Sequence, residues 1–576
     1  MKKLTTLLWF RRDLRLHDHP ALLHAVSTSA TLFPVYCLEV PTKKRCGHLR
    51  WLFLLESLAD LDSQLRALGS RLFVVRGKAP DVLPQLVKAW AVDQVLVQSS
   101  PEPFARARDE EVAQRVAKEG GEFHGFPGRT LFEVSQLLAG AGNGASDKGI
   151  PLPVTMTGFA KVADRLTVPK PEPAPTSIPL PLDSESALHQ LKSLLDPVSF
   201  ASLTGPHHDL SLPRISPTDH TVPELGLLTP LAARSPHTGG ESHALARLDT
   251  YMSHTAKVLA FEKPKTSPAA LPDPVTGLVD TTVLSPYMTY GCLSPRLFHS
   301  RITSAYRAAK GKHSKPPVSL LAQLYWREFF FAHGATVDGF ELATEANPTC
   351  PTPIDWRLLS AADSDPEAHD DLKAWAEART GYPWIDACMT QLRSEGWIHH
   401  LGRHSLACFL TRGDLYISWE RGAEVFEDVL LDHDWALNRG NWAWLSGTSV
   451  FFRQWFRVYS PVKWGQSWDA EGKYIKRHLP QLAKFPKQYI YEPWKAPLAV
   501  QKQAGCIVGK DYPKPIVDHA EASKANMAKL KACFARGRDK NGAGEDEGDA
   551  DEDIEKDKVG SSRAGRAAAR DRVKRK

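Results

Sequence analysis

Residues 7–22 read LLWFRRDLRLHDHPAL, and they open an alternation of apolar runs and amphipathic segments that continues to about residue 132. The run LLWF is expected to be a buried strand, and so are TLFPVYCL (31–38), RLFVVRG (71–77) and DQVLVQ (93–98). Helices are predicted where apolar side chains recur three and four residues apart, over 51–67, 80–90 and 103–119. This alternation predicts an α/β unit whose parallel sheet is covered by helices on both faces.

The chain begins with Met1-Lys2-Lys3 and an apolar run, a combination that imitates a secretory signal peptide. The run is only about seven residues long, ends at Arg11 and carries no small-residue cleavage site. We therefore expect a buried strand rather than a signal. No run approaches the length that crosses a bilayer, so no membrane association is expected.

The bulk composition sets broad limits. A chain of 576 residues is too long for one hydrophobic core, so two domains with additional unstructured segments are expected. The net charge of +6 permits a polyanionic partner without requiring one. The 8 cysteines are scattered, with no CxxC motif or Cys/His cluster, which suits a reducing compartment and argues against a disulfide framework or structural zinc.

Two changes of composition follow residue 132. Residues 133–240 include PKPEPAPTSIPLPLD (169–183) and further Pro, His and Ser residues, a composition that cannot hold a regular core. We expect a long connector there, part of which packs over the first domain. Residues 241–520 are helical in pattern and rich in Trp, which predicts a mostly α-helical second domain.

The end of the chain is strongly charged. Residues 545–557 form an acidic run, and 563–576 are basic and rich in alanine. Too few apolar residues remain to offset the entropy of ordering, so 521–576 is expected to be a disordered tail. Its last residues, RDRVKRK, suit a nuclear-import signal and equally a solvated charged end, so the expected location is the nucleus, the cytoplasm or both.

The segment WIHHLGRH (397–404) contains the first candidate site. His400 and His404 are four residues apart, so on a helix they share one face. Two imidazoles in an aromatic-rich domain suit a proton-handling site, because histidine titrates near neutrality. Zinc is disfavoured because no third ligand stands nearby and no HExxH motif appears. A purely structural role for the pair remains the alternative.

Two further segments carry polar side chains that suit a ligand. In LLDHDWALNRGNWAWLSG (430–447), Asp432 and Asp434 follow a predicted helix, and a carboxylate of this segment is expected within reach of Arg403, which points to another side of its helix than His404. An ordinary helix cap and a surface pair explain this segment as well. In TTVLSPYMTYGCLS (281–294), hydroxyls and backbone N–H groups at the start of a predicted helix suit phosphate, although many helix caps look alike. The chain has no GxGxxG and no P-loop.

Several aromatic residues are spaced so that they could pass an electron. Tyr416 and Trp419 lie three apart on one predicted helix, with Trp442 beyond them and Trp356 upstream. Indole and phenol rings ionise easily, and closely spaced rings conduct where one long jump is too slow. Taken alone, such a pattern favours core packing.

Nine blocks, taken together, resemble the photolyase/cryptochrome family, and within it the (6-4) photolyases and animal-like cryptochromes. They are LLWFRRDLRLHDHPAL, LSPYMTYGCLS, LYWREFF, TGYPWIDACM, GWIHHLGRH, TRGDLYISWERG, NRGNWAWLSG, KQYIYEPWKAP and CIVGKDYPKP. The resemblance covers residues 4–132 and 245–520. It implies a Rossmann-like, doubly wound α/β domain followed by a mostly α-helical FAD-binding domain.

The resemblance also implies the residues that hold FAD. Arg403 is expected to pair with Asp432, and Asn438 to lie near flavin N5. Beside a flavin ring, the Arg403–Asp432 pair favours a reduced, anionic flavin. An antenna chromophore, deazaflavin or folate, stays unassigned, because the loops at 36–39 and 100–102 identify no pocket. The full cofactor set is Thr281, Thr282, Val283, Leu284, Ser285, Gln323, Arg327, His400, Arg403, Asp432, His433, Asp434 and Asn438.

The implied activity is light-driven repair of (6-4) photoproducts in UV-damaged DNA, with His400 and His404 as the catalytic pair that supplies a proton to the lesion. The damaged dinucleotide is expected to be flipped out of the duplex. The lesion would contact Trp326, Tyr459 and Lys265, and the DNA backbone would contact Arg453, Arg457 and Lys463.

For the aromatic residues, the resemblance implies an electron-transfer chain of Trp442, Trp419 and Trp356 that ends at Tyr416. A tyrosine at this end resembles the animal-like cryptochromes of green algae. The alternative function is therefore a photoreceptor that signals through protein partners and its C-terminal tail. The two roles are compatible, and a monomer is expected in either case.

Overall fold

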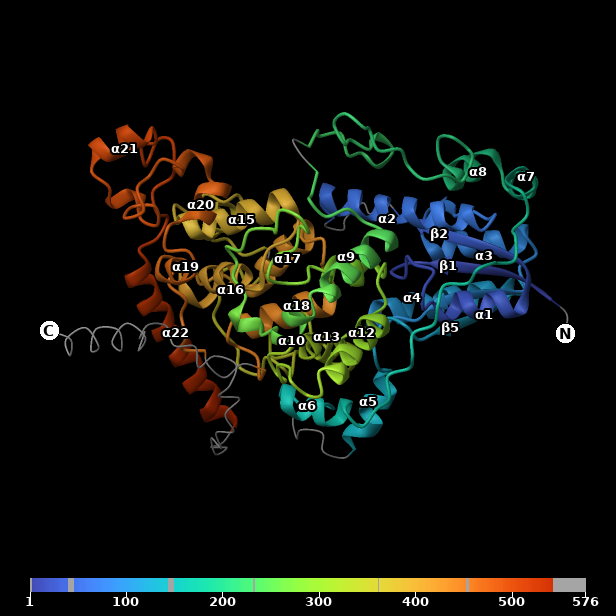
Figure 1. The fold of residues 1–576 in the computed structure, drawn as a ribbon, viewed down its shortest axis with the longest axis horizontal. Helices are drawn as coiled ribbons and strands as arrows, with labels where there is room; N and C mark the ends of the chain where they lie inside the picture. Colours follow the sequence, from blue (N-terminus) through green and yellow to red (C-terminus); the bar gives the residue numbers. More distant parts are fainter. Residues whose placement is uncertain are drawn as a thin grey trace.

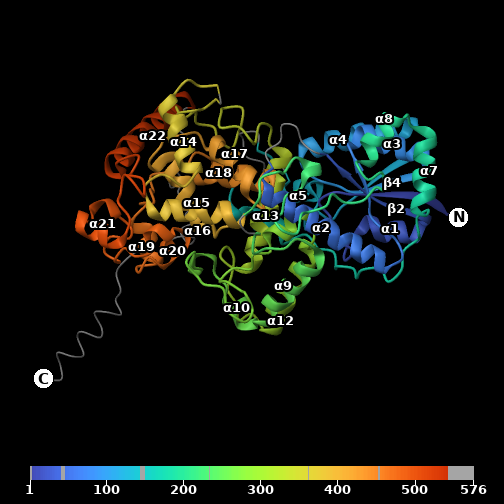
Figure 2. The same ribbon diagram turned by 90° about the horizontal axis from the view of Figure 1, so that it is seen from above.

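The computed structural model describes residues 3–39, 46–142, 150–231, 234–360, 362–451 and 455–541. Within this part of the chain, an α/β unit is followed by a larger helical unit (Figure 1). The sheet and the C-terminal helix α22 lie at opposite ends of the molecule (Figure 2).

The sheet of the described residues has five parallel strands in the order β3-β2-β1-β4-β5. The four strands predicted from apolar runs are present, while β5, with its Gly and His residues, was not predicted. The bounds are β1 (Leu4–Phe10), β2 (Ser29–Leu38), β3 (Phe73–Arg76), β4 (Gln94–Gln98) and β5 (Glu122–Phe126). The central position of β1 explains why all four residues of LLWF are buried.

Helices cover both faces of the sheet, as predicted. Successive side chains of a strand point to opposite faces. Leu8 and Phe10 of β1 therefore pack with the leucines of α1 and α2, and Leu7 and Trp9 pack with the apolar faces of α3 and α4. The bounds are α1 (Pro20–Thr28), α2 (His48–Ala67), α3 (Ala79–Ala89) and α4 (Pro103–Lys118). The unit is thus a doubly wound α/β fold.

The expected connector contains more regular structure than its composition predicted. Its elements are α5 (Val134–Ala141), α6 (Met156–Ala163), α7 (Ser184–Leu194), α8 (Pro197–Thr204) and the 3-10 turn η1 (Pro223–Leu225). Leu191 of α7 and Leu203 of α8 are buried in the core beneath the sheet. The expectation that 133–240 holds no regular core is wrong at these helices, although the Pro-rich stretch 169–183 forms neither helix nor strand.

The second unit is mostly helical, as predicted. Its helices are α9 (Glu241–Ser253), α10 (Thr255–Ala260), α11 (Ser285–Tyr290), α12 (Pro295–Ala308), α13 (Leu320–Thr336), α14 (Pro366–Ala376), α15 (Pro383–Glu395), α16 (His400–Cys408), α17 (Trp419–Val429), α18 (Trp435–Leu445), α19 (Lys463–Trp468), α20 (Lys473–His478) and α21 (Leu498–Ala504). Short turns are η2 (Lys263–Lys265), η3 (Phe409–Gly413), η4 (Pro480–Leu482) and η5 (Pro493–Lys495). A Cβ at Gly440 would lie 2.2 Å from Phe330, so α18 packs directly on α13.

Helix α22 (His519–Asn541) lies where a disordered tail was predicted. Leu530 and Cys533 are buried against Trp356 and Tyr416, and this burial stabilises a helix that composition alone did not predict. The prediction of disorder is therefore wrong for residues 521–541. The acidic run and RDRVKRK lie outside the described residues. Among the helices that are described, none is long and apolar enough to cross a membrane.

Candidate functional site

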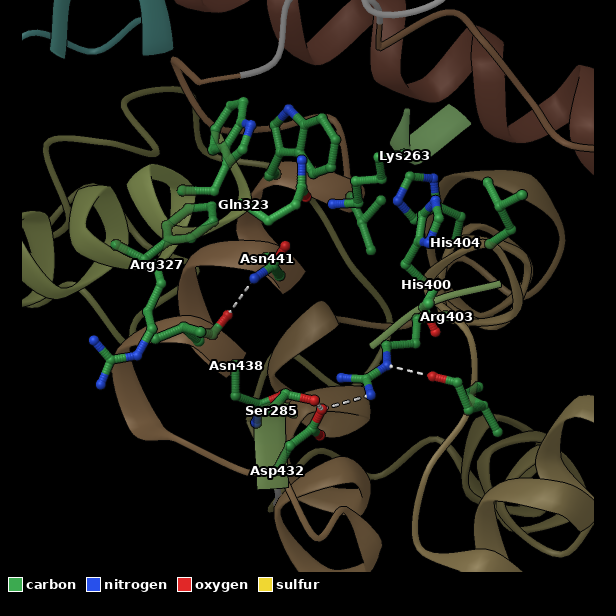
Figure 3. A pocket seen from close by; sticks show the side chains of 18 of the residues that line it. Lys263, Ser285, Gln323, Arg327, His400, Arg403, His404, Asp432, Asn438 and Asn441 are labelled. Carbon is green, nitrogen blue, oxygen red and sulfur yellow. Dashed lines mark hydrogen bonds and ion pairs between the residues drawn. The ribbon is translucent and has the colours of Figure 1, made fainter. Parts of the chain in front are cut away.

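The helical unit encloses a cavity of about 860 Å³, lined by α11, α13, α16, α18 and the turn η2 (Figure 3). The predicted site residues that line it are Thr281, Thr282, Val283, Ser285, Gln323, Trp326, Arg327, His400, Arg403, His404, Asp432, His433, Asp434, Asn438, Trp442 and Tyr459. These residues come from segments up to about 180 positions apart, and the fold brings them around one cavity.

The expected pair between Arg403 and Asp432 is present. Arg403 Nη2 lies 2.8 Å from Asp432 Oδ2, and the hydroxyl of Ser285 donates to the same oxygen at 2.7 Å. The side chain of Asp432 is only 5% exposed, so its charge depends on these two partners. Figure 3 shows the three side chains together at the floor of the cavity.

Helix α18 presents Asn438 and Trp442 to the cavity, and Asp434 fixes where this helix begins. The Asp434 carboxylate caps α18 by accepting from Ala436 N at 3.2 Å. It also accepts from Arg129 Nη2 at 2.5 Å and lies 3.4 Å from Arg12 Nη1. Both arginines belong to the α/β unit, which therefore helps to position the wall. Arg129 was not among the site residues predicted from the sequence.

Six buried polar atoms of residues that line the cavity have no hydrogen-bond partner within the described residues. They are Thr281 Oγ1, His404 Nδ1, Asp432 Oδ1, His433 Nδ1, Trp464 Nε1 and Trp468 Nε1. Unsatisfied buried polar atoms are costly, so they favour a polar ligand in the cavity. The volume, the hydroxyls beside α11 and the Arg403–Asp432 pair fit FAD, which carries phosphates and a polar heterocycle.

His400 and His404 share one face of α16, as predicted, with ring centroids 5.7 Å apart. Burial lowers the pKa of both imidazoles well below the ordinary value, and nearby cations lower it further. Without DNA, both rings are therefore neutral at neutral pH. The cations that act on one or both rings are Lys263, Arg403, Arg412 and Arg457.

Lys263 lines the cavity, and Lys265 does not. The side chain of Lys265 is 70% exposed and pairs with Glu262 at 2.8 Å, so it does not point into the cavity, and its contact with the substrate stays a prediction. Both lysines belong to the turn η2, where no regular period tells which side chain points inward.

Two residues predicted to bind the cofactor do not turn their side chains into the cavity. Leu284 is fully buried in the apolar core rather than on the cavity wall. Arg327 lies at the wall, but its guanidinium donates to Glu328 at 2.8 Å and to the backbone oxygen of Arg129 at 2.7 Å. It therefore points away from the cavity centre (Figure 3) and holds α13 against the α/β unit.

Aromatic side chains line another part of the cavity. The ring centroid of Tyr459 lies 6.1 Å from that of His404 and 4.6 Å from that of Trp464. The ring centroids of Trp326 and Trp444 are 5.9 Å apart. Such rings suit stacking on bases. Arg457 lines the same wall. Lys463 begins α19 outside the cavity lining, and Arg453 lies outside the described residues.

The expected electron-transfer residues run from the cavity towards α22. Trp442 lines the cavity and belongs to the same buried cluster as Trp419. Trp356 and Tyr416 have ring centroids 4.8 Å apart. Backbone bonds of 2.9 Å from Arg357 N to Tyr416 O and from Ser418 N to Arg357 O hold these segments side by side. Trp419 is the residue directly after Ser418, so the second of these bonds also places Trp419 beside this segment.

A smaller cavity of about 220 Å³ lies at the carboxyl ends of the strands. The chain reverses direction across the sheet between β1 and β4, and ligands of open α/β sheets bind at such a switch point. The guanidinium groups of Arg11 and Arg108 lie 4.7 and 5.0 Å from the Trp9 ring centre. Tyr36, Cys37, Glu39, Ser100 and Glu102 line this cavity, so the two loops that gave no assignment do form a pocket.

Comparisons with known proteins match both units. Profiles described as DNA photolyase and as the FAD binding domain of DNA photolyase match residues 6–176 and 320–532. The chain is 42% identical over 528 residues to cryptochrome-2 of Gallus gallus, covering 91% of this chain and 83% of that protein. It is 41% identical over 553 residues to the (6-4)DNA photolyase of Arabidopsis thaliana, covering 94% and 91%.

Solved structures of photolyases and cryptochromes share this fold over most of the chain. A Synechocystis cryptochrome has a TM-score of 0.72 at 26% identity, covering 92% of this chain and 100% of that one. A class III photolyase of Agrobacterium tumefaciens has a TM-score of 0.69 at 27% identity, covering 93% and 98%.

Proposed function

Because this chain belongs to the photolyase/cryptochrome family and carries its FAD-binding domain, we propose that it repairs (6-4) photoproducts in UV-damaged DNA under blue light. The observation that carries the proposal is the His400–His404 pair, which faces the cavity beside Lys263. Paired imidazoles suit a reaction that needs a proton donor at the lesion.

When bound, reduced FAD supplies a light-driven one-electron reductant. Arg403, Asp432 and Ser285 orient the cofactor at the cavity floor, and Asn438 and Trp442 line the wall beside it. The aromatic part of the cavity receives the flipped dinucleotide, where Trp326 and Tyr459 contact the bases.

The histidine pair then handles the proton. Phosphates of bound DNA offset the positive charge of Lys263 and Arg457, which raises the pKa of His400 and His404 from the low values of the free protein. One imidazole of the pair takes up a proton as the lesion binds and donates it to the lesion. Substrate binding thus prepares the acid.

The test is a repair assay on defined oligonucleotides that carry one (6-4) photoproduct or one cyclobutane dimer. We expect blue light to restore the (6-4) oligonucleotide, with reduced FAD bound, and to leave the cyclobutane dimer largely intact. Chromatography of the digested oligonucleotides measures both. An unchanged (6-4) lesion after illumination would rule out the proposed repair.

A second candidate function is photoreceptor signalling, supported by the contacts at the end of the aromatic chain. Tyr416 Oη donates to Asp355 Oδ1 at 2.7 Å, and Cys533 of α22 donates to the same oxygen at 3.1 Å. Burial, with Asp355 adjacent, raises the pKa of the Tyr416 phenol, so this ring keeps its proton until it is oxidised. The Trp356 radical cation would take an electron from Tyr416, whose phenol would then release its proton to Asp355 and change the contact of Asp355 with α22.

Tyr416→Phe tests this second candidate. The variant removes the ionisable phenol, so we expect the oxidised aromatic species after a flash to decay at least about tenfold faster than in the unmodified protein. Transient absorption measures the decay, and light-dependent proteolysis of α22 provides a second readout. Tyr489→Phe, half-buried outside this chain of rings, is the control. Equal lifetimes in all three proteins would exclude Tyr416 as the end of the chain.

The 220 Å³ cavity, with arginines beside an indole, suits an anionic aromatic antenna such as a deazaflavin or a folate. Chromatography of the chromophores released from purified protein distinguishes the two. The nuclear or cytoplasmic location, the monomeric state and the signalling partners are proposed on the sequence features given above.

A further inference from the structure

His399, which precedes the catalytic pair, is held in one protonation state by its neighbours. Its Nδ1 accepts from the backbone N–H of Leu401 at 3.2 Å, and its Nε2 lies 2.8 Å from Thr266 Oγ1. The Thr266 hydroxyl donates to Lys263 O at 2.8 Å, so its oxygen accepts from His399 Nε2–H. His399 is therefore neutral, with its proton on Nε2.

These bonds join two elements that are far apart in the chain. Thr266 ends the turn η2, whereas His399 caps the start of α16. Both side chains are buried behind the cavity wall, and their neighbours Lys263 and His400 face the cavity. The bonds therefore fix where the Lys263 backbone stands relative to α16. Figure 3 shows Lys263 and the two catalytic histidines on the same side of the cavity.

The position of Lys263 matters because its charge acts on all three imidazoles. Burial, with Lys263 and Arg403 nearby, lowers the pKa of His399 to about 3, so this ring does not compete for the proton. The groups that act on His400 are His399, Lys263, His404 and Arg403. Those that act on His404 are Lys263, Arg412, His399 and Arg457.

We infer that Thr266 and His399 form a positioning relay that holds Lys263 at the His400–His404 pair and so sets how readily this pair takes up a proton. The expected effect on repair rests on the proposed function, whereas the positioning of Lys263 by Thr266 and His399 does not. Thr266 and His399 are positioning residues, because they act through Lys263 and lie behind the wall.

The positive charge of Lys263 determines in which direction the pKa values of His400 and His404 change. Without the Thr266 hydroxyl, the turn loses its side-chain bond to α16 and the Lys263 ammonium is free to move towards solvent. Less positive charge then acts on His400 and His404, so their pKa values rise, by roughly one unit. Since the protonated pair is the active form, repair should persist to a pH higher by about the same amount.

The test uses the full-length, FAD-loaded protein with Thr266→Val, and Thr266→Ser as the matched control that keeps the hydroxyl. NMR titration of labelled imidazoles without DNA gives the pKa of His400 and His404, and single-turnover repair gives the pH profile. We expect an upward shift in Thr266→Val and none in Thr266→Ser. In a Lys263→Met background, Thr266→Val should add no further shift.

Equal titration midpoints in Thr266→Val and the unmodified protein would overturn the relay, as would a shift of the same size in the Lys263→Met background. Thr266→Ala removes the hydroxyl without adding bulk and replaces Thr266→Val if that variant does not fold. If the unmodified protein repairs no (6-4) lesion, the proposed function fails, whereas the imidazole titrations still decide the relay.

Discussion

Replacing His400 with alanine should lower repair of the (6-4) photoproduct at least about 100-fold while FAD stays bound, because a general acid contributes about that much. His400 lies 5.7 Å from His404 on one face of α16. Arg403 and Asp432, assigned to cofactor binding, form a 2.8 Å pair that the substitution should leave intact. Single-turnover repair of a defined oligonucleotide measures the first effect, and the flavin absorbance of the purified variant measures the second.

Two comparisons sharpen this prediction. If the two histidines act as one unit, the double variant His400→Ala/His404→Ala should be no slower than the slower single variant. His189→Ala, on the exposed surface of α7, is the control and should repair normally. Additive losses in the double variant would mean that the histidines act in separate steps, and full activity of His400→Ala would remove it from the mechanism.

The pair also determines the pH dependence of repair. Burial and nearby cations lower the pKa values of both imidazoles, so the free protein holds them neutral. Since repair uses the protonated form, its rate should fall as the pH rises through the pKa of the pair in the DNA complex. Residual repair by His400→Ala/His404→Ala should lack this dependence.

Short-range patterns in the sequence predicted much of the fold and part of the site. The apolar runs located β1 to β4, because strands buried on both faces must be continuously apolar. The i, i+4 spacing placed His400 and His404 on one face. The pairing of Arg403 with Asp432 came from the family resemblance, and the 2.8 Å contact agrees with it.

What the sequence did not predict depends on contacts between distant segments or on irregular backbone. Lys263 and Lys265 are indistinguishable in KPK, because a single 3-10 turn gives no period that separates the inward side chain from the exposed one. Thr266 and His399 are 133 positions apart, so nothing local connects them. Helix α22 owes its order to burial against Trp356 and Tyr416, which its own polar composition does not reveal.

Arg403→Met should weaken FAD binding roughly 30- to 100-fold. The substitution keeps much of the apolar stem but removes the guanidinium, so Asp432 retains only Ser285 as a partner. The proposed contact of the Arg403 guanidinium with the cofactor is a charge-assisted hydrogen bond, which contributes about 1.5–3 kcal/mol, so a loss of about 2–3 kcal/mol in binding free energy is expected. Each 1.4 kcal/mol corresponds to about tenfold in affinity. Flavin content after gel filtration and a binding titration measure the loss.

The matched control is Arg301→Met, which breaks the exposed pair with Asp249 at 3.0 Å, where the two side chains are 51% and 61% exposed. Exposed pairs contribute little, so FAD affinity should be unchanged. Arg403→Met should also lower the midpoint potential of the FAD that remains bound, because a positive charge that favours the anionic reduced form is gone and a negative one is left. Unchanged affinity and potential would mean that Arg403 serves only the protein fold.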